Sequence, residues 1–168
     1  MNGHMRAAHH ECFGKNVVIR LRKDEIKYMV DFATWKHAQG MEDTPAKFEA
    51  QTDGENADWM NEEICEALAD IKRKLRAYVP ERTRLRTNGH EDGEEWVLNL
   101  VMEPGWMGDA EELGKVTARY VVDKLLHEWY LLTLPDMADV YANRMEEDLR
   151  KMADIARDVD IDGVNFML

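Results

Sequence analysis

The pattern of hydrophobic and polar positions becomes regular at residue 16, after an opening stretch without periodicity. Residues 16–22 alternate with a period of two, and large apolar side chains fall on one side, at Val17, Ile19 and Leu21. This alternation predicts a strand with one buried face. We expect residues 1–15 to form a flexible arm.

A helical period follows the predicted strand. It begins at Asp24, and Gly40 supplies a natural end. The positions that share one face of this helix are Ile26, Met29, Val30, Ala33 and His37. Residues 41–56 are polar and contain Pro45 and Gly54, so they predict a loop with at most one turn of helix.

Apolar residues recur at spacings of three and four in the next segment, which predicts a second helix that ends just before Pro80. They are Met60, Ile64, Leu68, Ile71, Leu75 and Tyr78.

Residues 82–102 have the pattern of a β-hairpin. The segment RTRLRT is followed by a polar link that contains Asn88, Gly89 and Gly93, and then by EWVLNLVM. One side of this last segment is apolar: Trp96, Leu98, Leu100 and Met102. The strand over residues 16–22 can join the hairpin, since three strands are stable where two are marginal.

Two further helices close the chain. The helix predicted over residues 109–132 has a wide apolar face, made of Leu113, Val116, Tyr120, Val121, Leu125, Trp129 and Leu132. Pro135 then suits the first turn of a last helix. This helix has only a narrow apolar stripe: Ala138, Tyr141, Met145, Leu149, Met152 and Ala156. A wide stripe joined by a short link to a narrow one predicts an antiparallel helical hairpin, with the last helix outside.

The predicted fold is therefore mainly α. It is a bundle of about four helices with a closing helical hairpin and a small antiparallel β-sheet. We expect one domain over residues 16–157, followed by an extended C-terminal tail over residues 158–168.

Charge and cysteine content narrow the class of protein. The 22 Lys and Arg residues against 34 Asp and Glu residues give a net charge of -12, which disfavours a surface that clamps nucleic-acid phosphates. Two cysteines, Cys12 and Cys65, and the lack of an apolar signal segment favour a reducing compartment, and we expect synthesis in the cytoplasm. No apolar run approaches the roughly 20 residues of a membrane span.

The segment DVDIDG matches the first half of an EF-hand calcium loop, with Asp158, Asp160 and Asp162 as candidate ligands. That loop also needs a bidentate carboxylate at position 12 and a second helix. The sequence ends at Leu168, one position earlier, and Asn165 replaces the usual aliphatic residue. We therefore predict an acidic extended tail here and no metal or other cofactor.

The remaining candidates for chemistry have simpler interpretations. His4, His9, His10 and Cys12 lack a second cluster at zinc-binding spacing. His127 is expected to be a packed or rim histidine, and Cys65 a small buried hydrophobic residue. The chain contains no serine, and it lacks a Gly-rich phosphate loop and a nucleophile elbow, so we predict that it is not an enzyme.

A basic cluster stands out in the acidic chain: Lys72, Arg73, Lys74, Arg76, Arg82, Arg84 and Arg86. Opposite charges on two surfaces of one molecule suit head-to-tail association in a ring. The acidic counterparts that we expect are Glu146, Glu147 and Asp148. A solvated face with favourable charge at a helix C-terminus is the alternative explanation.

The C-terminal tail is rich in apolar residues: Val159, Ile161, Val164, Phe166, Met167 and Leu168. An exposed apolar end is unfavourable unless the protein's own core, or a partner's groove or sheet edge, covers it. Because the tail is too short to form a further helix, we expect a partner to receive it.

Two segments carry a resemblance to a known family. EEICEALADIKRKLRAYV resembles the early helix of the head-tail connector proteins of tailed bacteriophages, also called adaptors or head-completion proteins. VTARYVVDKLLHEWYLLTLPDMADVYANRMEEDLRKM is similar to their closing helical hairpin. The opening NVVIRLRKDEIKYMVDF looks like the start of phage neck proteins of the same group.

The resemblance implies a structural virion protein of the phage neck. It implies a homo-oligomeric ring of about a dozen copies, with C-terminal tails that bind the portal protein, a tail-side neck protein below, and double-stranded DNA passing through the lumen without sequence-specific binding. Two alternatives remain open: a tail-completion or terminator protein, and a small non-viral binding module with a calcium-responsive C-terminus.

Overall fold

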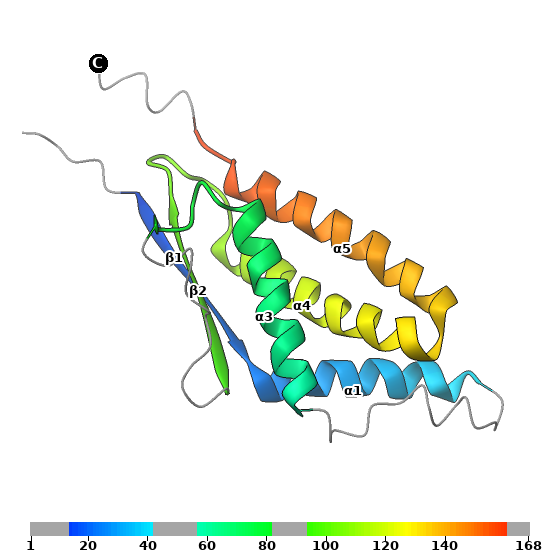
Figure 1. Cartoon of the computed structure of the whole chain (residues 1–168). Helices are drawn as coiled ribbons and strands as arrows, with labels where there is room; N and C mark the ends of the chain where they lie inside the picture. The colour runs from blue at the N-terminus through cyan, green and yellow to red at the C-terminus, as the bar shows by residue number, and fades with distance from the viewer. Residues whose placement is uncertain (1–13, 42–56, 82–93, 161–168) are drawn as a thin grey trace, which may run out of the picture.

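The computed structural model describes residues 14–41, 57–81 and 94–160. The elements in these ranges are β1 (Lys15–Arg22), α1 (Lys23–Gln39), α3 (Ala57–Lys74), β2 (Glu95–Met102), α4 (Ala110–Thr133) and α5 (Pro135–Ala156). Figure 1 shows the sheet at one end of the molecule, with α5 and α1 on opposite sides of α4. The predicted fold class, mainly helical with a small antiparallel sheet, is confirmed.

The sheet forms because two strands with matching apolar faces pair along their whole length. β1 and β2 are antiparallel, with Lys15 opposite Met102 and Arg22 opposite Glu95. The alternation predicted for both strands is confirmed, since the buried face consists of Val17, Ile19, Leu21, Trp96, Leu98, Leu100 and Met102. The first half of the predicted hairpin, over residues 82–93, lies outside the described residues.

α1 follows β1 without a linker, and the described residues cover it mainly on one side. Its buried stripe has a strict spacing of four: Ile26, Val30, Thr34 and Ala38. Met29, predicted on this face, is 37% exposed. The prediction placed the stripe too far round the helix, because α1 packs mainly on α4 and one line of side chains fills that contact.

α3 confirms the predicted second helix, and the five predicted apolar positions from Met60 to Leu75, the last of them just past the end of α3, are buried. The helix ends at Lys74, earlier than predicted. The chain then turns, and the carbonyl oxygen of Tyr78 accepts a hydrogen bond from the Val101 amide (2.8 Å). This bond joins the segment after α3 to the outer edge of β2.

α4 is the central helix, as predicted. It packs against α5, α3, α1 and β1. Leu132, predicted to be buried, is 83% exposed, and Trp129 is only half-buried. Tyr130 fills the core at this end instead, because it lies between the rings of His37 and Tyr141, with both centroid distances 5.5 Å.

α5 folds back on α4 after a one-residue link, Leu134, and Pro135 occupies the first turn as expected. Ala138, Tyr141, Met152 and Ala156 of the predicted stripe are buried. The predicted antiparallel helical hairpin is therefore confirmed, with α5 as the outer helix (Figure 1).

Candidate functional site

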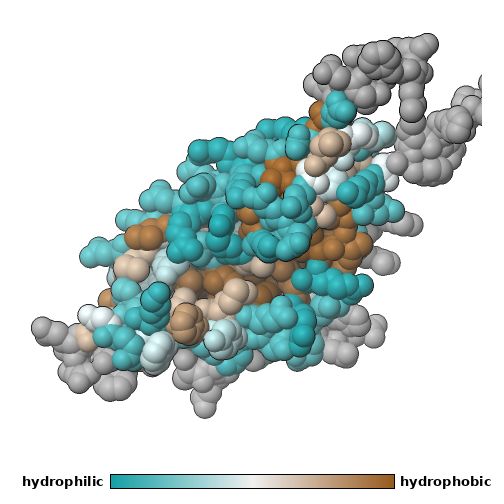
Figure 2. Space-filling view, turned by 180° about the vertical axis from the view of Figure 1, so that it is seen from behind, coloured by the Kyte–Doolittle hydropathy of each residue, from teal (hydrophilic) through white to brown (hydrophobic). Residues whose placement is uncertain are grey.

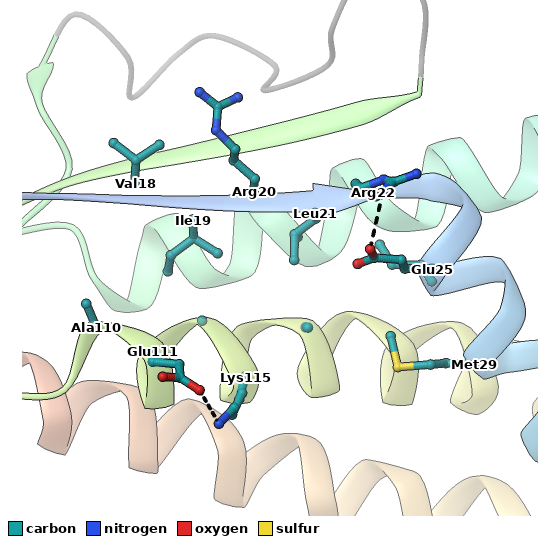
Figure 3. Close-up of a pocket in the computed structure, with 13 residues that line it drawn as sticks. Val18, Ile19, Arg20, Leu21, Arg22, Glu25, Met29, Ala110, Glu111 and Lys115 are labelled. Carbon is teal, nitrogen blue, oxygen red and sulfur yellow. Dashed lines mark ion pairs between the residues drawn. The ribbon is translucent and has the colours of Figure 1, made fainter.

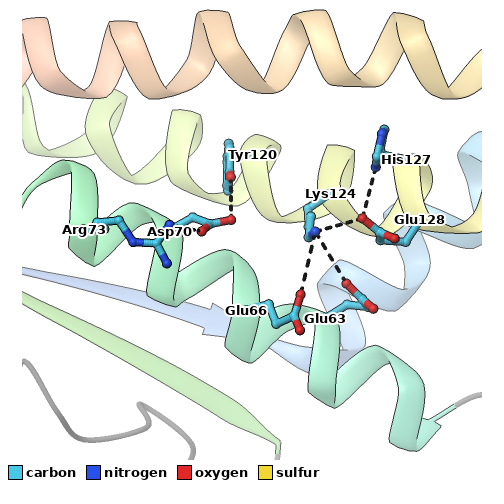
Figure 4. Close-up of polar contacts among 8 residues, drawn as sticks. All are labelled: Glu63, Glu66, Asp70, Arg73, Tyr120, Lys124, His127 and Glu128. Carbon is cyan, nitrogen blue, oxygen red and sulfur yellow. Dashed lines mark hydrogen bonds and ion pairs between the residues drawn. The ribbon is translucent and has the colours of Figure 1, made fainter.

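A polar seam joins α3 to α4 (Figure 4). Lys124 lies at its centre, with 14% of its side chain exposed, and its Nζ is 2.8 Å from Glu128, 3.8 Å from Glu66 and 3.9 Å from Glu63. Burial lowers the pKa of Lys124, but these three carboxylates outweigh burial and raise it. Lys124 therefore stays protonated and holds three carboxylates around one charge.

The carboxylates of the seam respond differently to the same cation. Burial, together with Glu128, raises the pKa of Glu63. Burial also acts to raise the pKa of Glu128, but hydrogen bonds from Lys124 and His127 lower it overall. His127 Nδ1 is 3.1 Å from Glu128, and 21% of its side chain is exposed, in keeping with the predicted packed or rim histidine.

At the other end of the seam, the hydroxyl of Tyr120 donates a hydrogen bond to Asp70 (3.2 Å), which also pairs with Arg73 (3.1 Å). Burial and the nearby Asp70 raise the pKa of Tyr120, so this hydroxyl stays protonated. Each charge in the seam has an opposite charge beside it. The arrangement fixes α3 against α4, and we interpret it as structural.

A second polar layer lies between α4 and α5, where two aspartates are buried. Arg119 donates to both carboxylate oxygens of Asp148 (3.0 and 2.9 Å), and Arg144 Nε is 3.1 Å from Asp123 Oδ2. Burial raises the pKa of Asp123 to about 6, although Arg144 opposes the shift. The sequence pattern did not predict either aspartate as a buried residue.

The outer face of α1 carries a row of exposed aromatic side chains, which we call the aromatic row: Tyr28, Phe32 and Trp35. They are 68%, 49% and 49% exposed. Tyr28 stacks on Phe32 with centroids 6.1 Å apart, and Phe32 is 6.0 Å from Trp35. Their spacing of four and three residues would have indicated a second apolar face on this helix, which the prediction missed.

The space-filling view from behind shows that apolar residues also reach the surface elsewhere. A brown band runs across the middle of this face, between hydrophilic margins (Figure 2). Contiguous exposed apolar surface of this kind is typical of an interaction surface.

The predicted basic cluster is only partly within the described residues. Arg73, Lys74 and Arg76 are exposed at the end of α3, whereas Lys72 is half-buried, and burial lowers its pKa. The other three members, Arg82, Arg84 and Arg86, lie outside the described residues.

The predicted acidic surface needs one correction. Glu146 and Glu147 are exposed on α5. Asp148 is buried and pairs with Arg119 in the same chain, so it is not available to a second copy. The reason is helical geometry, since Asp148 lies on the face of α5 that contacts α4.

The start of the C-terminal tail is held by its own chain. Val159 forms an antiparallel bridge with Trp106, the Met107 amide donates to the Asp158 carbonyl (2.8 Å), and the Asp160 amide donates to the Gly105 carbonyl (3.0 Å). The other tail residues predicted to bind a partner (Ile161, Val164, Phe166, Met167 and Leu168) lie outside the described ranges, as does Asp162 of the calcium-loop pattern.

Among the described residues, no group of three or more His, Cys, Asp or Glu side chains is placed to hold a metal ion. Cys65 is partly buried against the core, close to its predicted role. None of the helices in the described ranges has the length and apolar character needed to cross a bilayer.

The chain was compared with protein-family models, curated proteins and solved structures. No family model, curated protein or solved structure matches this chain significantly.

Proposed function

We propose that this protein is a structural protein of the bacteriophage neck, a head-tail connector that assembles as a ring between the portal and the tail. The observation that carries the proposal is the aromatic row on α1. Three large aromatic side chains, each about half exposed or more, lie on one helix face. Aromatic residues are enriched at the centres of protein interfaces, so this face suits contact with another protein.

The distribution of charge supports assembly of identical copies. Arg73, Lys74 and Arg76 are exposed at the end of α3, while Glu146 and Glu147 are exposed on α5. Surfaces of opposite charge on different elements favour a head-to-tail contact, which closes into a ring if the rotation allows it. The same complementarity would increase the rate of docking.

The net charge of -12 fits a ring through which DNA passes. An acidic wall repels phosphates, so DNA slides without being held. The resemblance of the α3 segment and of the α4–α5 hairpin to phage connectors gives this proposal its particular place in the virion.

The test is to mix the protein with the portal protein encoded in the same genome and to image the mixture by electron microscopy. We expect rings docked on the portal. A protein that stays monomeric and does not bind the portal would contradict the proposal. Binding to the tail tube instead would favour a tail-completion role.

A pair of variants tests the aromatic row within the same experiment. Phe32→Ser combined with Trp35→Ser should lower the docked fraction at least tenfold, with little change in melting temperature because both side chains are exposed. Val140→Ser is the matched control, since Val140 is 46% exposed on α5. If the double variant docks as well as the Val140→Ser control, the aromatic row is not part of the interface with the portal.

A further inference from the structure

Among the residues that the structure describes, no strand pairs with the outer edge of β1. The Lys23 amide donates a hydrogen bond to the Glu94 carbonyl (2.9 Å). Because hydrogen-bonded pairs alternate along an antiparallel ladder, the odd-numbered residues of β1 direct their backbone N–H and C=O groups toward β2. The backbone groups of Val18 and Arg20 therefore point outward. Within the described ranges these groups make no hydrogen bond. The outer edge of β2 differs, because its Val101 amide donates a hydrogen bond to the Tyr78 carbonyl.

A groove runs along this open edge. It has a volume of about 340 Å³ and lies between β1, the start of α1 and the first half of α4 (Figure 3). Small residues of α4 line it at a spacing of four: Ala110, Gly114 and Ala118. A Cβ atom added at Gly114 would meet nothing within 4 Å, so there is space beside the strand.

The geometry points to β-strand addition: the C-terminal segment 161–168 of a second copy binds along the outer edge of β1. An exposed strand edge presents unpaired amides and carbonyls that an extended peptide satisfies, and the adjacent groove accepts its side chains. This inference rests on the proposed self-assembly and names the contact that links one copy to the next.

The length of the segment fits the edge. Residues 161–168 comprise eight residues, which span roughly 26 Å when extended. The edge from Asn16 to Arg22 has seven residues and is slightly shorter, roughly 23 Å on the same rise per residue. The bridge between Val159 and Trp106 already holds the preceding residues in an extended conformation.

The proposed ring favours a second copy over the same chain, because each copy must then contact its neighbour. The tail runs antiparallel to residues 105–107, and those residues lead into α4 at Ala110, where the groove begins.

The chemistry of the groove matches the segment. Five of the eight tail residues are apolar (Ile161, Val164, Phe166, Met167 and Leu168), and the groove contains Ile19, Leu21, Ile26 and Met29. Lys115 stands at its rim, opposite in sign to Asp162. Its present partner, Glu111, forms an exposed ion pair with it that exchanges at little cost.

Disulfide cross-linking between full-length chains tests the inference. In a background with Cys12→Ala and Cys65→Ala, a chain with Val18→Cys is mixed with chains that carry Cys at 164, 165 or 166. Under mild oxidation we expect at least one mixture to form a heterodimer several times more abundant than Val140→Cys gives with the same partners. Heterodimer yields no higher than those of this control would overturn the inference. A chain that carries both Val18→Cys and one of the tail cysteines completes the test, and a cross-link found only within such a chain would also overturn it.

Proline at the edge provides a second measurement. In the Val18→Cys chain, Arg20→Pro removes an outward N–H without breaking the β1–β2 ladder, so the cross-link should fall several-fold, while Arg20→Thr should retain it. Circular dichroism confirms that both variants are folded. Retention of the cross-link in a folded proline variant would overturn the strand contact.

These outcomes are separable from those of the proposed function. Rings that dock on the portal in the absence of the cross-link would overturn only the tail contact. A cross-link between copies that never bind a portal would support the tail contact and contradict the connector role.

Discussion

Asp148 of α5 is held by Arg119 of α4: both carboxylate oxygens accept hydrogen bonds from the guanidinium, and only 2% of the Asp148 side chain is exposed. Arg119 itself is 46% exposed, so water reaches one side of the pair. The hydrogen bond to Asp148 is the main reason that the pKa of Arg119 is raised. The pair links the two arms of the helical hairpin.

Arg119→Gln should lower the free energy of unfolding by about 2 kcal/mol, because it leaves a buried carboxylate without its cation. The loss is smaller than for a fully buried pair, since solvent partly replaces the guanidinium. Urea denaturation at neutral pH measures it. Arg150→Gln is the control: its pair with Glu146 is exposed, and the change should stay below about 0.5 kcal/mol.

Asp123 makes stability depend on pH. Its pKa is about 6 in the folded protein, against 3.8 for the ordinary carboxyl, so between these values the folded state binds a proton that the unfolded state has lost. Its contribution to stability is therefore largest below pH 4 and is lost as the pH rises to about 6. By linkage the loss is about 3 kcal/mol.

Asp123→Asn removes this titration. The free energy of unfolding of the variant minus that of the unmodified protein should therefore increase by about 3 kcal/mol from pH 4 to pH 7. Urea titrations at pH 4, 5.5 and 7 give the difference directly. A difference between the two proteins that does not change with pH would contradict the assignment.

Lys124→Met leaves Glu63 and Glu128 close together without a cation. Both are largely buried, at 16% and 26% exposure, so we expect a loss of about 2 kcal/mol at pH 7. Adding Glu63→Gln should recover about half of it. Lys115→Met, which removes an exposed pair with Glu111, serves as the control for losing a lysine.

Two glycines should respond in opposite directions to alanine. At Gly108 a Cβ atom would lie 2.5 Å from the Ile155 carbonyl oxygen and 2.6 Å from the Trp106 ring, so the backbone must move, at a cost of about 1–3 kcal/mol. At Gly114, inside α4, nothing lies within 4 Å, and Gly114→Ala should add about 0.5–1 kcal/mol. Denaturation midpoints of the two variants that shift in the same direction would contradict this contrast.

The elements were predictable because their signals are local. The alternation at Val17, Ile19 and Leu21 and the spacing from Met60 to Leu75 reflect which face of each element meets a core, and the described structure buries those faces. Pro135 after a wide apolar helix was enough to predict the hairpin of α4 and α5.

Errors occurred where exposure depends on which neighbour is present. Leu132 continues the apolar pattern of α4 but projects into solvent, whereas Tyr130 is covered by His37 and Tyr141. Met29 has the right spacing on α1, yet α4 covers only one line of that helix.

By itself, the sequence determined the strands, the helices and the order in which they follow one another, since periodicity records burial within each element. Only the tertiary structure decided that Asp148 is a buried partner of Arg119 and that, within the described ranges, no strand pairs with the outer edge of β1. Ion pairing and strand pairing join residues far apart in the chain, and a carboxylate or an amide has the same local sequence pattern whether its partner is a distant side chain or water.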